Sequence, residues 1–318
     1  MICRPRLRLT LYSAVLLLLC LPAGKGYQAV SALAQAPILQ ELQTYVNARS
    51  VIDLSPAELI EFYPELQKLT FAKSQEALEP LLQKVGEKVE AFFHDFPNTT
   101  SLEKVRRERM RGTGQLEARV DEEYNYLLLA RPREGAIGVE EDRAGVAGGL
   151  PERRKMPGAS FLTSGYASTS IFFHPLCRSG TRFRYLGMQA PKPGTYVIAF
   201  SQKPETRWPS GVFKMEEQSA FLLIQGVAWI DPASYQIVRM RTDLLMPRPD
   251  VGLNRQTTEI QFNEVRFESI SRSIWLPKEV VVTIVYQSQI YRNRHRYSHY
   301  KLFTVETEEK LGKPSVPP

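Results

Sequence analysis

The chain has 318 residues, of which 43% are hydrophobic and 24% are charged, and its formal net charge at pH 7 is +7. Four of the positive charges lie in residues 1–34, which contain no acidic residue, so the rest of the chain carries only +3. A charge this small gives no reason to expect a nucleic-acid partner. The sequence also contains none of the glycine loops, serine elbows or metal-ligand spacings of common enzyme classes. We therefore expect no catalytic residue, no cofactor and no metal ion.

The N-terminus has the anatomy of a secretory signal. Arg4, Arg6 and Arg8 precede an apolar run over residues 9–21, and small residues suitable for cleavage follow the run. The run is shorter than the roughly 20 apolar residues that cross a bilayer. We predict that residues 1–34 form a signal peptide with an undetermined cleavage site, and that the mature protein is periplasmic or secreted and touches membranes peripherally at most. Retention of the leader as an anchor is the alternative.

Cysteine usage predicts an exported protein without a disulfide framework. Cys3 and Cys20 leave with the signal peptide, so Cys177 has no intramolecular partner in the mature chain. Stability must then come from burial, and about 285 mature residues are enough for a substantial core.

Residues 35–118 are predicted to form a helical region. Ser55 is suited to an N-cap and Pro56 to the first helical position, so a helix should begin there. Residues 74–93 carry apolar side chains at three- and four-residue steps, as an amphipathic helix requires. We expect these helices to pack against the rest of the fold, and a partner surface is the alternative use.

The stretch that follows the helical region has a weaker pattern. Residues 122–130 have the composition of a first strand, whereas residues 135–158 combine glycine, proline and charge without an apolar period. We predict a mobile surface loop over residues 135–158. Residues 161–175 fit a strand and a short helix equally well, and residues 311–318 are predicted to be a disordered tail.

From Gly180 onward, apolar and polar residues alternate in consecutive runs, which is typical of an antiparallel sheet. The predicted strands cover residues 181–186, 195–201, 220–231, 237–241, 258–267, 279–286 and 290–306. Gly226 and a phase slip within the fifth of these runs indicate bulges. Asp231 and Pro232 open a turn that joins two strands as a hairpin. We therefore expect one sheet domain over residues 119–310, with sequence neighbours paired in the sheet.

The last predicted strand carries arginine at every second position. Arg292, Arg294 and Arg296 should share one face of the sheet, where they predict an anion-binding ridge for phosphate or carboxylate. A solvated outer face is the alternative. His295 and His299 lie about 13 Å apart along a strand, which excludes a shared metal ion.

Four segments in this part of the chain form a series. They are Gly-Val-Ala-Trp-Ile-Asp-Pro at 226–232, Ile-Val-Arg-Met-Arg at 237–241, Ile-x-Phe-x-x-Val at 260–265 and Trp-Leu-Pro-x-Glu-Val at 275–280. The series resembles the sheet of outer-membrane lipoprotein-sorting proteins of the LolA/LolB type and of uncharacterised secreted bacterial relatives. The resemblance implies a half-open antiparallel barrel, closed on one side by helices, whose apolar cavity receives acyl chains in the sorting proteins.

These observations predict an α+β fold: a curved antiparallel β-sheet, a LolA-like half-barrel, with an N-terminal helical region. We expect an exported, non-enzymatic envelope protein that binds a lipid, a lipoprotein or another amphipathic ligand. The predicted cavity residues are apolar or aromatic: Phe183, Tyr185, Phe221, Leu223, Trp229, Phe262, Phe267, Trp275, Val282 and Ile284. Each of them fits the ordinary core as well.

Two alternatives stay open at this point. The helical region and the arginine ridge would also suit a protein–protein interaction module of the cell envelope that has no small ligand. A nucleophile pair made by His174 and Cys177, three residues apart, would instead indicate an envelope hydrolase.

Overall fold

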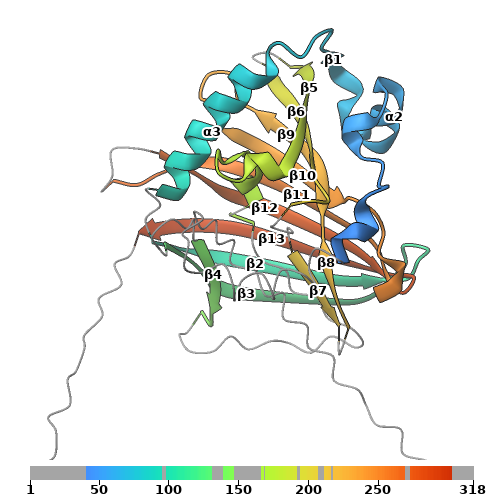
Figure 1. The fold of residues 1–318 in the computed structure, drawn as a ribbon. Helices are drawn as coiled ribbons and strands as arrows, with labels where there is room; N and C mark the ends of the chain where they lie inside the picture. The colour runs from blue at the N-terminus through green and yellow to red at the C-terminus, as the bar shows by residue number, and fades with distance from the viewer. Residues whose placement is uncertain are drawn as a thin grey trace, which may run out of the picture.

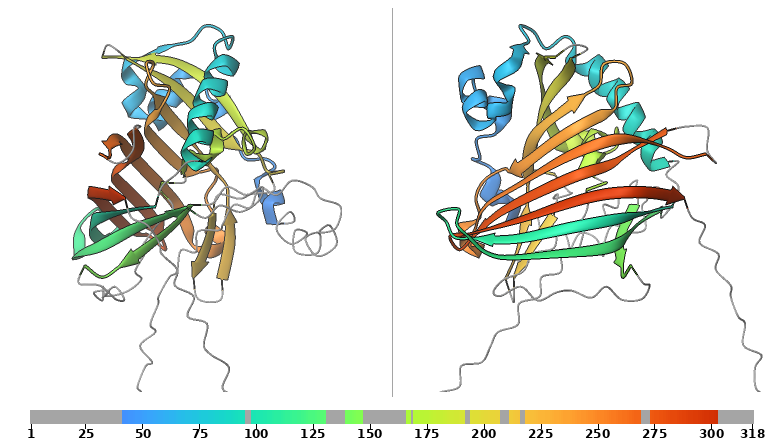
Figure 2. Two further views of the ribbon diagram at one scale, coloured as in Figure 1. Left: turned by 90° about the vertical axis from the view of Figure 1, so that its left-hand side faces the viewer. Right: turned by 180° about the vertical axis from the view of Figure 1, so that it is seen from behind.

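The computed structural model describes residues 41–94, 98–130, 139–146, 166–167, 169–191, 194–206, 211–215, 218–268 and 273–302. These residues form one antiparallel sheet of eleven strands, a separate two-stranded hairpin and short helical segments around them. The sheet is strongly curved and open, and it is not closed into a barrel (Figures 1 and 2). The predicted α+β class, with a curved antiparallel sheet, is therefore confirmed.

The large sheet uses strands from most of the described chain. Its strands are β1 Leu69–Phe71, β2 Thr99–Met110, β3 Leu116–Ala130, β4 Val139–Ala144, β5 Thr181–Gln189, β6 Thr195–Gln202, β9 Ile224–Ile230, β10 Ile237–Leu244, β11 Leu253–Arg266, β12 Ser273–Tyr286 and β13 Gln289–Leu302. The separate hairpin consists of β7 Gly211–Met215 and β8 Gln218–Leu222. The order across the sheet is β1-β5-β6-β9-β10-β11-β12-β13-β2-β3-β4. Sequence neighbours pair from β9 to β13 as predicted, and β2 joins the far side of β13.

Helical segments cover both faces of the first half of the sheet (Figure 2). The helix α2 Pro56–Phe62 shares a core cluster with Trp229, whereas the helix α3 Leu78–His94 shares a different cluster with Phe200. We call the α3 side the inner face and the α2 side the outer face. The 3-10 helix η4 Thr169–Phe173 and the β7–β8 hairpin also pack on the inner face.

Local sequence explains both helices. Ser55 caps α2 by accepting a hydrogen bond from the Glu58 amide at 3.4 Å, and the Glu58 carboxylate accepts one from the Ser55 amide at 2.7 Å. The buried side chains of α3 include Leu81, Leu82, Val85 and Val89. Both predicted helices are thus confirmed. None of the helices in the described ranges has the length and apolar composition needed to pass through a bilayer.

The remaining short 3-10 helices connect these elements. They are η1 Gln43–Tyr45, η2 Val51–Asp53, η3 Pro64–Lys68, η5 Arg178–Gly180 and η6 Pro249–Val251. In η3, Pro64 follows directly after the C-cap of α2, where a proline cannot continue the helix.

The helical prediction for residues 35–118 is wrong at β1 and beyond His94, because β1, β2 and the first part of β3 fall inside this range. Charged residues occupy inner-face positions of β2, among them Glu103 and Arg107. The strand therefore lacks the apolar alternation that identifies a half-buried strand in a sequence.

The range 135–158, predicted as a loop, contains β4 at the edge of the sheet, paired with β3. The rest of that range, apart from residues 145–146, lies outside the described residues. The predicted signal peptide over residues 1–34 and the predicted tail over residues 311–318 also lie outside them. Residues 161–175, which fitted a strand and a helix equally well, contain η4.

The predicted strand at residues 220–231 is in fact two strands, because Leu223 separates β8 from β9. Gly226 forms no bulge and pairs in register on both sides. A Cβ atom at this position would lie 2.0 Å from the Arg241 carbonyl oxygen, so the glycine permits close approach of the neighbouring strand. The second predicted bulge, within residues 258–267, is wrong: the register shifts between Gln261 and Phe262 because β12 carries the extra residue, Lys278.

Candidate functional site

The inner face has a seam where the C-terminal end of α3 meets β11 and β12. A pocket of about 20 Å³ lies in this seam, and Phe92, Phe262 and Trp275 line it. All three side chains are half-buried. A space of this size holds no more than about one water molecule, so a larger ligand would enter only if the two sides of the seam moved apart.

Polar groups surround this pocket. Lys88, Ser170 and Gln236 contribute to its lining. One turn earlier on α3, the Lys84 ammonium lies 4.5 Å from the centroid of the Tyr235 ring and donates a hydrogen bond to its hydroxyl at 3.0 Å. The seam therefore places an ammonium group beside half-buried aromatic rings, which is an arrangement suited to an amphiphile with an anionic head.

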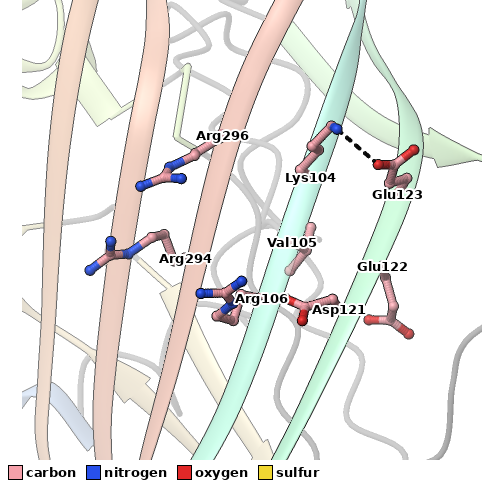
Figure 3. A pocket seen from close by; sticks show the side chains of 8 residues that line it. All are labelled: Lys104, Val105, Arg106, Asp121, Glu122, Glu123, Arg294 and Arg296. Atoms are coloured by element: carbon pink, nitrogen blue, oxygen red, sulfur yellow. Dashed lines mark hydrogen bonds and ion pairs between the residues drawn. The ribbon is translucent and has the colours of Figure 1, made fainter.

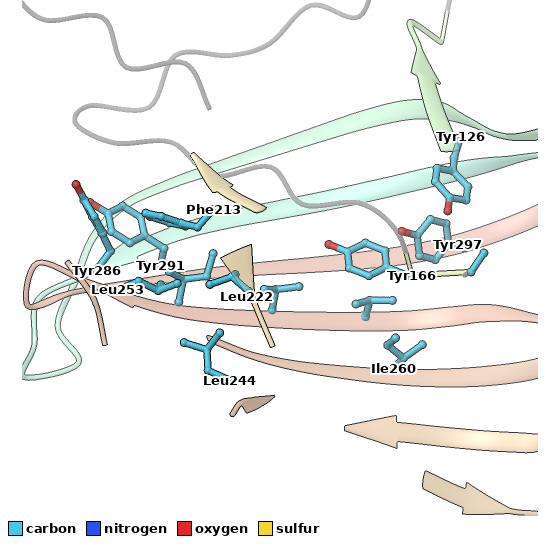
Figure 4. Close-up of a cluster of buried hydrophobic side chains, with 14 of the residues drawn as sticks. Tyr126, Tyr166, Phe213, Leu222, Leu244, Leu253, Ile260, Tyr286, Tyr291 and Tyr297 are labelled. Carbon is cyan, nitrogen blue, oxygen red and sulfur yellow. The ribbon is translucent and has the colours of Figure 1, made fainter. Parts of the chain in front are cut away.

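Five of the predicted cavity residues lie on the inner face, two of them at the seam and three in or against the large core cluster that includes Tyr126 and Ile260. Phe262 and Trp275 line the pocket, and Phe267 packs against the same core cluster. Val282 and Ile284 are buried within that cluster. Figure 4 shows part of this cluster, with tyrosine, aliphatic and phenylalanine side chains.

The other five predicted cavity residues are distributed elsewhere. Phe183 and Tyr185 pack against the inner-face cluster beneath α3. Phe221 and Leu223 belong to a small separate cluster, and Trp229 belongs to the outer-face cluster beneath α2. The ten residues therefore do not line one shared cavity. Alternation predicts the face that a side chain occupies within its own strand, but it does not predict which distant residues meet it.

A buried polar cluster on the inner face was missed by the sequence analysis. The Glu103 carboxylate is fully buried, and its Oε1 accepts hydrogen bonds from His295 Nδ1 at 2.8 Å and from the Tyr297 hydroxyl at 2.9 Å. Arg143 of β4 donates to the same oxygen from Nη2 at 2.8 Å. The Tyr166 hydroxyl lies 3.1 Å from His295 Nε2.

The electrostatics of this cluster favour an ionised carboxylate and a neutral imidazole. Burial alone would raise the pKa of Glu103, but Arg143 and the hydrogen bond from His295 outweigh it and lower the pKa to about 2. Burial lowers the pKa of His295, and Glu103 opposes that effect. The imidazole therefore donates from Nδ1 to Glu103 and accepts at Nε2 from Tyr166. Because these groups are buried, we interpret the cluster as structural: its hydrogen bonds hold β4 and Tyr166 against β2 and β13.

The predicted arginine ridge lies on the outer face of β13, as the alternation indicated. Arg292 Nε lies 3.1 Å from Glu108 Oε2, while Arg294 and Arg296 both approach the Glu279 carboxylate, at 3.6 Å and 3.3 Å. The buried alternate residues of β13 are Tyr291, Asn293, His295 and Tyr297. Each ridge arginine therefore has a carboxylate nearby, and two of them share one.

The surroundings of His174 do not favour a nucleophile pair with Cys177. His174 is buried, and its Nδ1 accepts a hydrogen bond from the Leu176 amide at 3.2 Å. Burial lowers the pKa of His174, with an opposing effect from Glu90. Cys177 lines a different feature, a surface pocket of about 350 Å³.

No protein-family model matches the chain, and the search of curated proteins finds no match. Among solved structures, one similar chain is a domain assigned to the outer membrane lipoprotein-sorting proteins, from Vibrio parahaemolyticus. Its TM-score is 0.38 at 12% identity, with 71% of this chain and 94% of that chain covered. A DUF1329 family protein from Desulfovibrio piger has a TM-score of 0.36 at 12% identity, with 72% and 95% covered. Both TM-scores are below 0.5, and similarity at this level says nothing of what this chain binds.

Proposed function

We propose that the protein is an exported, non-enzymatic envelope protein that binds a lipid, a lipoprotein or another amphipathic ligand in the seam between α3 and the inner face of the sheet. The observation that carries this proposal is the gathering of three half-buried aromatic side chains, Phe92, Phe262 and Trp275, around one pocket beside Lys88. Complete burial of such a side chain contributes about 1.5–3 kcal/mol, so an acyl chain inserted here gains affinity from surface that the protein leaves partly exposed. Lys88 would pair with an anionic head group.

The two ends of α3 differ in a way that suits entry at the seam. The first turns bury Leu81, Leu82 and Val85 against the sheet, whereas Phe92 and Phe93 in the last turn are only half-buried. Local opening is easiest where few apolar contacts are lost. Movement of the last turn of α3 would therefore widen the pocket while the first turns keep the helix in place.

Trp275 provides a direct test, because the chain has only three tryptophans. The double variant Trp208→Phe, Trp229→Phe retains Trp275 as the single fluorophore, and the mature protein is titrated with a fatty acid brominated along its chain. We expect saturable quenching of Trp275. The matched variant that retains only Trp229, on the outer face, should not be quenched. Absence of quenching at Trp275, or equal quenching at Trp229, contradicts the proposal.

A pair of phenylalanine variants checks the location of the ligand. Phe262→Ala should weaken binding about tenfold because it removes apolar surface from the pocket. Phe221→Ala changes a predicted cavity residue that packs in a separate cluster, and it should leave the affinity unchanged. Native mass spectrometry of protein purified from the secretory compartment would identify a lipid that remains bound.

A further inference from the structure

The outer face of β13, β2 and β3 has a groove of about 600 Å³ that is separate from the seam (Figure 3). Lys104 and Arg106 of β2 and Arg294 and Arg296 of β13 line it. These four side chains are between 41% and 60% exposed, so their charged groups reach solvent. The groove is therefore lined by cations that a ligand in solution can contact.

Like charges face each other directly across this groove. The register between β13 and β2 pairs Arg294 with Arg106 and Arg296 with Lys104. Directly opposed side chains in an antiparallel pair have Cβ atoms about 4.5–5.5 Å apart, and like charges at such positions destabilise the sheet. Two successive pairs of this kind create a repulsion that an anion bound between the strands would relieve.

The carboxylate on the β12 side neutralises this charge only in part. Glu279 is shared by two guanidinium groups, with Arg294 Nε at 3.6 Å and Arg296 Nε at 3.3 Å. One negative charge thus serves two positive charges on this side of the groove.

The β3 side shows the same imbalance. Asp121 is shared by Arg106 and Arg119, at 2.8 Å and 2.7 Å, while Glu123 pairs with Lys104 at 3.1 Å. Over both sides, five cations share three carboxylates, which leaves a surplus of two positive charges around the groove. Figure 3 shows Asp121 and Glu123 on the strand next to Lys104 and Arg106.

We propose that this groove is a binding site for a phosphate monoester. A phosphate monoester carries about −1.5 to −2 charges at pH 7, which matches the surplus. Guanidinium groups bind phosphate oxygens with paired, charge-assisted hydrogen bonds, so Arg106 and Arg294 can hold the anion from the two facing strands. Two arginines of the predicted ridge belong to this site, whereas Arg292 pairs with Glu108 outside it.

The direct test is a calorimetric titration of the mature protein with glycerol 3-phosphate, with chloride at equal ionic strength as the reference. We expect saturable binding that weakens as salt is added and that raises the unfolding temperature. Arg106→Gln and Arg294→Gln should each weaken binding about tenfold. Arg292→Gln is the matched control on the same strand and face, and it should change the affinity by less than about twofold.

A variant with the opposite effect separates binding from folding. Glu279→Gln increases the surplus positive charge from two to three and should tighten binding about threefold. A damaged fold would not produce a gain in affinity. Unchanged or weaker binding by Glu279→Gln would contradict the charge balance on which the proposal rests.

Vesicles distinguish the two sources of a phosphate monoester. Cosedimentation with vesicles that contain phosphatidic acid, but not with neutral vesicles, would assign the site to a lipid head group if glycerol 3-phosphate fails to bind. Binding of both assigns it to phosphate monoesters in general. The proposal is overturned if neither binds, or if Arg106→Gln and Arg294→Gln bind as well as the wild type. These outcomes are independent of Trp275 quenching, which tests the inner face.

Discussion

Two ion pairs between β2 and β3 are formed by adjacent residues on each strand and therefore lie on opposite faces of the sheet. Arg106 and Asp121 are 2.8 Å apart on the outer face, with side chains 44% and 50% exposed. Arg107 and Glu122 are 2.7 Å apart on the inner face, with side chains 3% and 2% exposed. The contact distances are nearly equal, so burial is the difference that separates the two pairs.

The charges on the two faces of these strands therefore behave differently. On the outer face, water screens each charge, so a pair contributes little and its cations stay able to meet a ligand. On the inner face, each charge has lost its hydration and depends on its partner. A register slip of one residue would exchange the two sets of side chains, so the buried charges of Glu103, Arg107 and Glu122 also help to specify the register.

The largest expected effect comes from breaking the inner pair. Glu122→Gln removes the carboxylate charge that faces the buried Arg107 guanidinium, and it should lower the free energy of unfolding by about 3–5 kcal/mol. Urea unfolding followed by circular dichroism measures the change. Replacing both residues by methionine should recover much of the loss, because no uncompensated charge stays buried. A loss below about 1 kcal/mol for Glu122→Gln would mean that the inner pair behaves like a surface pair.

The second largest expected effect is a loss of stability at acid pH, caused by the buried charges of the inner face. The pKa of Glu103 is lowered to about 2 from an ordinary value of 4.5. Its contribution to stability is therefore complete above about pH 4.5 and is lost as the pH falls toward 2, with a total of about 3 kcal/mol. His295, whose pKa is lowered by burial from 6.5, adds a loss below pH 6.5 because the unfolded imidazole takes up a proton more readily.

The corresponding measurement is the free energy of unfolding over a pH series for the wild type and for Glu103→Gln. The wild type should lose stability more steeply below pH 4.5, because the glutamine variant has no carboxylate to protonate at this site. Parallel curves for the two proteins would show that Glu103 does not cause the loss.

The smallest expected effect is on the outer face. Asp121→Asn should change the free energy of unfolding by less than about 1 kcal/mol, because Arg106 and Asp121 are both exposed to solvent. The same urea titration applies, and added salt should reduce the effect further. A loss as large as that of Glu122→Gln would indicate that the outer face is covered in solution.

Local sequence patterns alone predicted the position of several helices and strands. Ser55 and Pro56 located the start of α2. Period-two alternation located β5, β6 and the strands from β9 onward, and it placed Arg292, Arg294 and Arg296 on one face. Such features depend on neighbours within a few residues, so the sequence contains them directly. The strand β2 was missed for the same reason, because its inner positions carry charges rather than apolar side chains.

By itself, the sequence determined the fold class and the face that most side chains occupy. Only the tertiary structure decided which faces meet and which charges are buried. Glu103 and His295 are 192 residues apart in the chain and become partners because β2 pairs with β13. The same pairing sets Arg106 against Arg294 across the outer groove. Register between distant strands depends on the packing of the whole sheet, so no local pattern contains it.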